Sequence, residues 1–221
     1  MKKHDYLSVV YNRDQRPKTA YVRKHVEILV SNFNLSLSDS LLEIGCGNCN
    51  ILNEFSAFDL SVKGVDLSVL SGSEYPYIEV VIGDIEKSPL PFPSSSFDVI
   101  FSKSVVEHLS DPAVYFSEAF RLLKPGGKLI TMTPDWEVQL HKFYDNWTHK
   151  SPFTLPKLRS LLRLYSFVSP QVFYFKQLPC LWNNRYLLLF SNILAPFIHE
   201  RERSKLRWIR ERQILSCGVK P

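Results

Sequence analysis

Three acidic residues, Glu43, Asp66 and Asp84, each stand near the end of a short apolar run. Two glycines, Gly45 and Gly47, follow the first acid, and glycines let a backbone turn tightly and approach a ligand closely. A carboxylate beside such a loop suits a cationic ligand. Asp66, 21 residues after Gly45, is placed to accept from both hydroxyls of a ribose. Asp84 is placed to accept from an exocyclic amine such as that of adenine. Taken singly, each feature is also explained by a tight turn or a helix cap.

The glycine loop differs from the phosphate-binding dinucleotide loop, which reads G-x-G-x-x-G. Its third position is Asn50, and Glu43 precedes the first glycine by two residues. Both features disfavour a pyrophosphate ligand. Cys46 and Cys49 within the loop form a C-x-x-C pair, a pattern that also serves zinc binding and redox chemistry. Because no second cysteine pair lies nearby in the sequence, we expect neither.

A second group of polar and aromatic residues is typical of an acceptor site. Histidine and aspartate side chains take protons from hydroxyls, and aromatic faces stack on ring-shaped substrates. We favour His149 as the base. The other candidates are His108 and Asp135 as catalytic residues and His141 and Tyr144 as substrate contacts. The alternatives are a histidine at 108 that only packs and an ordinary aromatic surface loop at 133–154.

The composition is that of a packed globular protein. Of 221 residues, 45% are hydrophobic and 22% are charged, which excludes a disordered chain, a collagen and a coiled coil. Four cysteines are too few for a disulfide-stapled scaffold. The formal net charge of +5 permits an anionic partner without requiring one. The length predicts one domain over residues 1–221.

Neither an export signal nor a membrane span is expected. Two lysines near the N-terminus are not followed by the apolar run of a signal peptide, so we expect a cytoplasmic protein. The longest apolar stretch, Leu181–Ile198, is interrupted by polar residues and by Pro196. It therefore falls short of the roughly 20 apolar residues of a span. We expect a core helix there, the alternative being a helix on a membrane surface that gives peripheral association.

Strand-like and helix-like segments alternate through the first half of the chain. Apolar periodicity predicts the helices, and short apolar runs that stop at glycine or an acid predict buried strands. This alternation indicates parallel strands with helices on both faces, and ligands in such sheets bind beyond the carboxyl ends of the strands. The expected helices are 19–33, 48–58, 111–123, 155–167 and 182–198, and the expected strands are 40–45, 61–66, 77–85, 97–102, 128–133, 172–178 and 212–219.

Six sequence blocks resemble class I S-adenosylmethionine-dependent methyltransferases, in particular the type 11 group of small-molecule enzymes. The blocks are LEIGCGN at 42–48, GVDLS at 64–68, GDI at 83–85, FDVIFS at 97–102, VEHL at 106–109 and LLKPGGKLI at 122–130. The resemblance implies an α/β, Rossmann-like three-layer sandwich whose seven-stranded, mostly parallel sheet has the order 3-2-1-4-5-7-6, with strand 7 antiparallel. It also implies a cofactor-binding half at about 20–133, substrate and lid elements at about 134–200 and a last strand at about 212–219.

The resemblance further implies which residues hold the methyl donor, S-adenosylmethionine. The two glycines would line its methionine part, Glu43 would contact its amino group and Asp66 its ribose hydroxyls. Asp84 would accept from the adenine amine, and Ile85 would donate its backbone N–H. The implied cofactor-binding residues are Glu43, Gly45, Gly47, Asp66, Leu67, Asp84, Ile85 and Ser102.

From this resemblance we expect O-methylation of a small-molecule or sugar acceptor in surface-glycan or related biosynthesis. The basic segment 200–212 is compatible with an anionic acceptor. An RNA methyltransferase, a non-catalytic cofactor-binding partner subunit and a nicotinamide-dependent oxidoreductase stay open as alternatives. Glu107-His108 resembles part of the E-x-x-E-H metal motif of small-RNA 2′-O-methyltransferases and of some ubiquinone-pathway O-methyltransferases. The first glutamate of that motif is Ser104 here, and we expect no metal.

Overall fold

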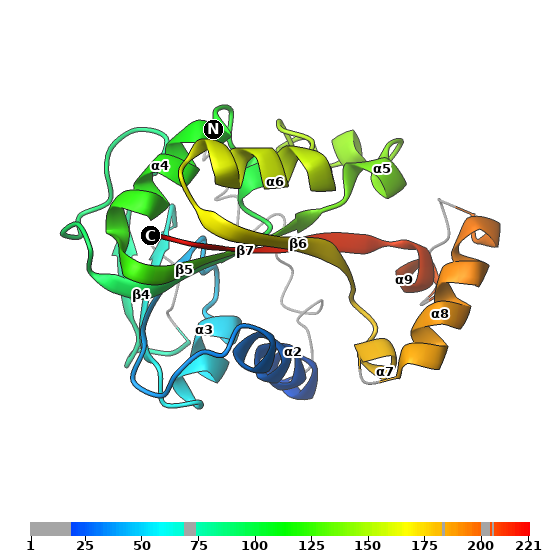
Figure 1. Cartoon of the computed structure of the whole chain (residues 1–221), viewed down its shortest axis with the longest axis horizontal. Coiled ribbons are helices and arrows are strands. Elements are labelled where there is room, and N and C mark those ends of the chain that lie inside the picture. The colour runs from blue at the N-terminus through cyan, green and yellow to red at the C-terminus, as the bar shows by residue number, and fades with distance from the viewer. Residues whose placement is uncertain (1–18, 69–73, 183, 200–203, 205) are drawn as a thin grey trace, which may run out of the picture.

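The computed structural model describes residues 19–68, 74–182, 184–199, 204 and 206–221. Its centre is a seven-stranded sheet in the order β3-β2-β1-β4-β5-β7-β6. This order, with β7 antiparallel to its neighbours, confirms the predicted Rossmann-like fold (Figure 1). The strands are β1 Ser40–Ile44, β2 Ser61–Asp66, β3 Glu79–Ile82, β4 Phe97–Lys103, β5 Leu123–Pro134, β6 Val168–Lys176 and β7 Arg212–Val219.

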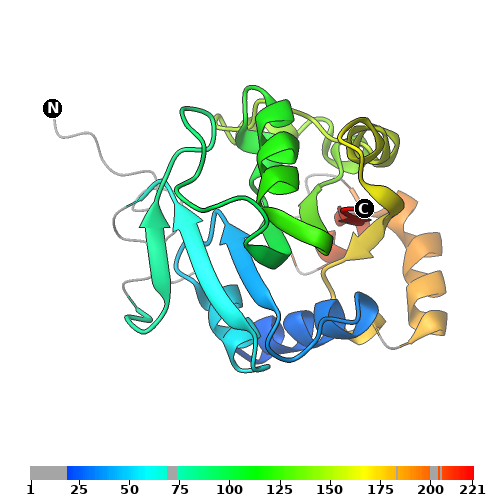
Figure 2. The same cartoon turned by 60° about the vertical axis from the view of Figure 1, so that its left-hand side comes forward.

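Parallel pairing joins the strands from β3 to β5. Figure 2 shows β1, β2 and β3 side by side with their arrowheads pointing the same way. β7 then runs antiparallel between β5 and β6. Because parallel neighbours end at the same edge of a sheet, the carboxyl ends of β1 to β4 lie together. The sequence predicts the ligand site at that edge.

Helices cover both faces of the sheet and complete three layers (Figure 1). α2 Thr19–Asn32 and α3 Asn50–Ser56 lie on one face, and α4 Pro112–Leu122 and α6 Leu155–Leu164 lie on the other. β4 shows why both faces need cover. Ile100 belongs to the core beneath α4 and α6, while Val99 and Phe101 belong to the core beneath α2 and α3, as side-chain alternation along a strand requires.

Short elements form the remaining connections. These elements are the 3-10 turns Val106–His108, Phe143–Asp145 and Ala195–Phe197 and the helices α5 Trp136–Gln139, α7 Pro179–Trp182, α8 Arg185–Leu194 and α9 Arg207–Arg210. The turn Val106–His108 follows β4, and α5 and the turn Phe143–Asp145 follow β5, so these three lie near the carboxyl edge of the sheet.

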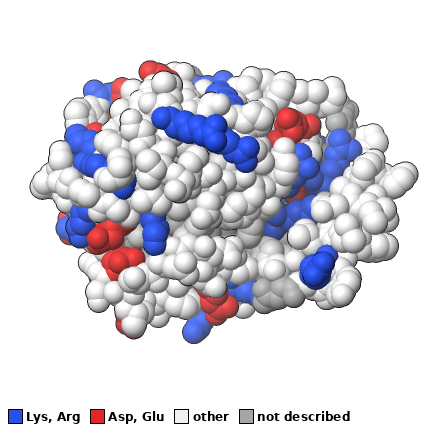
Figure 3. Space-filling view, viewed as in Figure 1, with Lys and Arg blue, Asp and Glu red and all other residues white. Residues whose placement is uncertain are grey.

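The prediction of a core helix at 182–198 is wrong. Ser191 is the one buried residue of α8, and its large apolar side chains are between 39% and 76% exposed: Tyr186, Leu187, Leu188, Leu189, Phe190 and Ile193. The reason is its position, because α8 lies beyond the end of β6, where no sheet face covers it (Figure 1). Figure 3 shows the resulting surface, poor in charge, at the right of the view. Among the described residues, no helix combines the length and the apolar character needed to cross a bilayer.

Some predicted bounds are also wrong. The sequence predicts a helix up to 123 and a strand only from 128, but β5 begins at Leu123. Leu123 pairs with Phe97 and Lys128 with Val99, so the intervening residues form an irregularity within the strand instead of ending it. The predicted helix 155–167 ends at Leu164, before Ser166, whose φ of 63° is left-handed. The third strand, expected at 77–85, is reduced to Glu79–Ile82.

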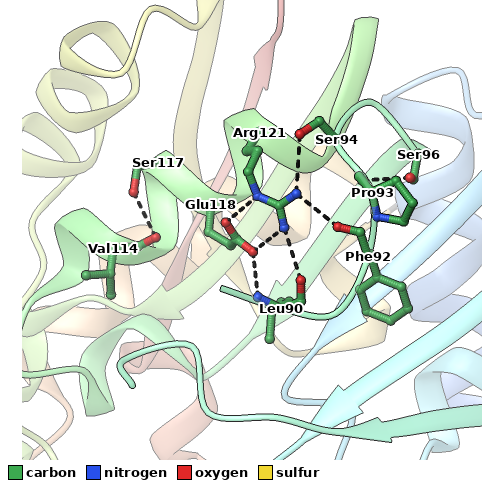
Figure 4. A network of polar contacts seen from close by, with 9 residues as sticks. All are labelled: Leu90, Phe92, Pro93, Ser94, Ser96, Val114, Ser117, Glu118 and Arg121. Carbon is green, nitrogen blue, oxygen red and sulfur yellow. Dashed lines mark hydrogen bonds and ion pairs between the residues drawn. The ribbon is translucent and has the colours of Figure 1, made fainter. Parts of the chain in front are cut away.

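An ion pair on α4 anchors the connection between β3 and β4 (Figure 4). Arg121 and Glu118 form two hydrogen bonds, of 2.7 and 2.8 Å. Glu118 also accepts from the backbone N–H of Leu90 at 2.7 Å, and Arg121 donates to the backbone oxygens of Leu90 and Phe92. The backbone N–H and the backbone oxygen of Leu90 are thereby both hydrogen-bonded. These bonds hold the Leu90 side chain in the wall of a pocket at the carboxyl edge of the sheet.

Candidate active site

A pocket of about 540 Å³ opens at the carboxyl edge of the sheet. The loops after β1, β2 and β3 form one wall, and the turn after β4 and part of the segment 133–154 form the other. Its lining includes Gly45, Gly47, Asp66, Leu67, Asp84, Ile85, Lys87, Ser104, Val105, His108, Trp147, Thr148 and Lys150. Six of the eight predicted cofactor residues, Leu67 among them, thus share one cavity with the predicted catalytic His108.

The loop after β1 has the backbone that its glycines predict. Gly45 has a φ of 74° and Gly47 a φ of 52°, both in the left-handed region that favours glycine. A Cβ at Gly45 would lie 2.4 Å from Cγ2 of Val105. Glycine is therefore required at position 45 for two reasons, conformation and space.

The C-x-x-C pair lies beneath this loop. Cys46 and Cys49 are free, buried thiols in the core between the sheet and α2 and α3. Cys49 adopts a φ of 61° and precedes α3. Within the part of the chain that the structure describes, the one group of side chains arranged as metal ligands does not include them.

Glu43 lies behind the pocket and does not line it. Its side chain is buried, and Oε2 has no hydrogen-bond partner among the described residues. Burial raises the pKa of this carboxyl well above its ordinary value, and the nearby ammonium of Lys103 acts in the opposite direction. An unpartnered buried acceptor of this kind is suited to a ligand donor such as an ammonium group.

Asp84 is fixed by local contacts at the pocket wall. Its Oδ1 accepts from the backbone N–H of Glu86 at 3.0 Å, and its Oδ2 lies 2.7 Å from Nζ of Lys87. The hydrogen bond from Lys87 lowers the pKa of Asp84, so the side chain is a carboxylate at neutral pH. Ile85 lines the pocket beside it.

Ser102 lies in the interior, outside the pocket lining. Its hydroxyl hydrogen-bonds the hydroxyl of Tyr115 at 2.7 Å, which in turn bonds Oγ1 of Thr131 at 2.9 Å. This buried chain of hydroxyls links α4 to β4 and β5. The expected position of Ser102 beside the ligand is not reproduced.

His108 and His149 lie together although 40 residues separate them in the sequence. Their ring centroids are 4.8 Å apart. Nδ1 of His149 bonds the backbone oxygen of Phe143 at 2.7 Å, and Nδ1 of His108 bonds Oγ1 of Thr148 at 2.9 Å. Burial lowers the pKa of both histidines, that of His108 to about 4. At neutral pH both are uncharged.

Glu107 completes this group, and the sequence does not predict it as a site residue. Its buried Oε2 accepts from Oγ1 of Thr133 at 3.0 Å, and burial raises the pKa of the carboxyl to about 7. Its backbone oxygen accepts from the N–H groups of Lys150 and Ser151, at 2.8 and 3.0 Å. These bonds hold the segment 133–154 against the turn after β4.

Four candidates from the segment 133–154 lie outside the pocket lining: Asp135, His141, Tyr144 and the favoured base His149. Asp135 is fully buried, 2.6 Å from Nε of Arg212, and it caps α5 by accepting from the backbone N–H of Glu137. His141 and Tyr144 are exposed. The residues of this segment that do line the pocket are Trp147, Thr148 and Lys150. In the sequence they are indicated by the aromatic and basic composition of the segment.

Part of the chain is similar in sequence to known proteins. Residues 42–131 match the family described as methyltransferase domain. A malonyl-[acyl-carrier protein] O-methyltransferase of Hahella chejuensis is 32% identical over 116 residues, which are 48% of this chain and 40% of that protein. The chain spans between 22% and 46% of the length of eight curated relatives that it matches.

Solved structures share the fold at low sequence identity. A SAM-dependent methyltransferase from Archaeoglobus fulgidus superposes with a TM-score of 0.70 and 19% identity, over 98% of this chain and all of that one. A phosphoethanolamine N-methyltransferase 2 of Haemonchus contortus, in complex with S-adenosyl-L-methionine, gives a TM-score of 0.65 and 19% identity over 90% of this chain and 52% of that one. Residues 42–131 therefore match the methyltransferase domain model, and the chain has the fold of solved S-adenosylmethionine-dependent methyltransferases.

Proposed function

We propose that the chain transfers a methyl group from S-adenosylmethionine to a hydroxyl of a small-molecule or sugar acceptor. The observation that supports this is one pocket in which Gly45, Gly47, Asp66, Asp84 and Ile85, from three successive strand ends, meet His108. Its volume of about 540 Å³ lies within the roughly 300–1,000 Å³ of small-molecule sites.

The residues present fit the proposed donor. Asp66 is a hydrogen-bond acceptor for ribose hydroxyls, and Asp84 and the backbone of Ile85 suit the edge of an adenine. The orphaned Oε2 of Glu43 lies behind the glycine loop and suits an amino group, directly or through water. When bound, the donor supplies a methyl group already activated by a positively charged sulfur. The protein must then mainly align acceptor and donor and exclude water.

The acceptor side of the pocket supplies proton acceptors. His108, which lines the pocket, and His149, which packs against His108 outside the lining, are neutral at pH 7 because burial lowers their pKa, so each can take a proton from a hydroxyl. Trp147 offers an aromatic face, and Lys150 a cation that would favour an anionic acceptor. Small-molecule acceptors are also what several relatives are named for, including phosphoethanolamine and 27-O-demethylrifamycin SV.

Two measurements test the proposal. Calorimetry with S-adenosylhomocysteine should show saturable binding, whereas NADH should not bind; the reverse would favour an oxidoreductase. Incubation with methyl-labelled donor and fractionated cell extract, followed by mass spectrometry, should place label in a small molecule. Label in a ribonuclease-sensitive fraction would identify an RNA methyltransferase. Binding without label in any fraction would identify a non-catalytic partner subunit.

A further inference from the structure

We propose that Glu107, His108 and His149 bind one divalent transition-metal ion at the wall of the pocket. One ligand atom from each side chain lies within 4.8 Å of the others. Two atoms that ligate one ion at about 2.1 Å are at most about 4.2 Å apart. Small side-chain rotations are therefore enough to bring all three atoms to bonding distance.

The carboxylate of Glu107 provides an independent reason to place a cation there. The side chain is fully buried, and Oε1 has no hydrogen-bond partner among the described residues, while Oε2 is held by Thr133. A buried oxygen without a partner destabilises the fold, and more so when it is charged. Lys103 is the cation that acts on this carboxyl. A bound metal ion would satisfy the orphaned oxygen directly.

Both histidines are oriented as metal ligands usually are. In metal sites the second ring nitrogen of a ligating histidine is held by an oxygen of the protein. Here Nδ1 of His108 bonds Oγ1 and the backbone oxygen of Thr148, and Nδ1 of His149 bonds the backbone oxygen of Phe143. Nε2 is accordingly the ligating nitrogen in each ring.

The three side chains come from two segments that are fastened together. Glu107 and His108 lie in the turn after β4, and His149 lies in the segment 133–154. The hydrogen bonds from Lys150 and Ser151 to the backbone oxygen of Glu107 keep the segments in contact. His149 supplies the third ligand, and Ser104, whose position would be a carboxylate in the motif E-x-x-E-H, is not one of the group.

The ligand types indicate which metal fits. Two imidazoles and one carboxylate suit zinc, cobalt, iron or manganese better than calcium or magnesium, which prefer oxygen ligands. Three protein ligands leave a coordination position open, as catalytic zinc sites do. Since His108 also lines the pocket, that position is accessible to an acceptor hydroxyl, whose pKa the ion would lower.

This role in the reaction rests on the proposed function, whereas the binding of the ion does not. In this arrangement His108 and His149 are ligands and neither is the base. The acceptor hydroxyl would lose its proton to solvent, and its oxygen would then bond the methyl carbon while the carbon–sulfur bond of the donor breaks, leaving the electron pair on sulfur and S-adenosylhomocysteine as the second product.

The test is a titration of the full chain, freed of metal with a chelator, with Co²⁺. Visible absorption should report one bound ion per chain, and Zn²⁺ should displace it. His108→Ala and His149→Ala should each weaken Co²⁺ binding more than about 100-fold, because even outer-shell partners of metal-binding histidines contribute about 10–100-fold. Glu107→Gln, which keeps the shape of the side chain, should also weaken binding. His141→Ala, an exposed histidine of the same segment, should bind Co²⁺ like the parent protein.

Circular dichroism checks that each variant is folded. Absence of saturable Co²⁺ binding by the parent protein would overturn the proposal, as would unchanged affinity in folded His108→Ala and His149→Ala. Asp66→Ala separates the two proposals, because it should weaken S-adenosylhomocysteine binding and leave Co²⁺ binding intact. A parent protein that binds Co²⁺ but not S-adenosylhomocysteine would keep the metal site and remove the proposed function.

Discussion

Oδ2 of Asp66 accepts a hydrogen bond of 2.8 Å from the backbone N–H of Gly47. The bond connects the end of β2 to the loop after β1. Oδ1 of the same carboxylate accepts from the backbone N–H of Ser68 at 3.2 Å. Two backbone donors on neighbouring loops therefore fix the orientation of the carboxylate at the pocket wall before any ligand enters.

Replacing this carboxylate should weaken ligand binding. We expect Asp66→Ala to reduce the affinity for S-adenosylhomocysteine by about 1–3 kcal/mol, the usual contribution of hydrogen bonds to a charged group. Calorimetry measures the change. Glu79→Gln is the matched control, since Glu79 is an exposed acid on β3 paired with Lys63 and should leave affinity unchanged. Equal affinity in Asp66→Ala and the parent protein would remove Asp66 from the site.

Two glycines with similar backbone angles should respond differently to alanine. Gly45 has a φ of 74° and Gly126 a φ of 79°, so each substitution carries a conformational cost of about 1–2 kcal/mol. Only at Gly45 would the new methyl group also collide with Val105, whereas nothing lies within 4 Å at Gly126. Gly45→Ala should therefore lower the free energy of unfolding more than Gly126→Ala in denaturant titrations. Adding Val105→Ala should recover the difference, and a double variant no more stable than Gly45→Ala would contradict this reading.

Loss of His149 should affect turnover and not donor binding. His149 contacts Phe143 of its own segment and His108 of the turn after β4, but it does not line the pocket. We expect His149→Ala to lower kcat by about 10²–10⁴-fold, the range for a lost proton-transfer group, with unchanged S-adenosylhomocysteine affinity. The measurement needs the acceptor identified by the labelling experiment. Full turnover in His149→Ala would exclude His149 as the base, whereas its role as a metal ligand is tested by the Co²⁺ titration.

A buried histidine on α2 should make the fold sensitive to acid. His25 packs against Phe175 and Trp182, and burial lowers its pKa to about 3. An unfolded histidine titrates near pH 6.5, so below that pH the unfolded chain binds more protons and unfolding is favoured until the folded pKa is reached. At pH 5 the loss is about 2 kcal/mol.

Denaturant titrations between pH 7 and pH 4 test this expectation with His25→Phe, which keeps an aromatic ring in the cluster. The variant should lose less stability on acidification than the parent protein. Other groups with shifted pKa values, such as the Glu43 carboxyl, whose pKa is raised, contribute equally to the pH dependence of stability in both proteins. Their contributions therefore cancel in the difference. His141→Phe, at an exposed position, serves as the control. Identical pH dependence in His25→Phe and the parent protein would show that folding leaves the pKa of His25 near its unfolded value.

The cofactor half of the site was predictable because its residues lie at strand ends. An acid or glycine that stops an apolar run, such as Gly45 or Asp66, reveals both the strand and the edge at which the residue lies. The acceptor half follows from contacts between distant segments. Asp135 resembles a catalytic acid in the sequence, yet Arg212, 77 residues away, neutralises it in the interior.

Burial of helices is equally hard to predict from local pattern. The apolar residues of α8 predict a core helix, and only the placement of the helix beyond β6 leaves them exposed. No local pattern in the sequence distinguishes Glu107 as a site residue, because its proposed role as a ligand depends on His149 being folded against it.

The insertion of β7 between β5 and β6 has a consequence for biosynthesis. β6 joins the sheet only through β7, and residues 212–219 are translated after every other strand of the sheet. On the ribosome, β5 and β6 must therefore wait with unpaired edges until this last strand emerges, and such edges are sites of aggregation. Nascent chains stalled before residue 212 should thus depend more on chaperones than chains stalled behind it.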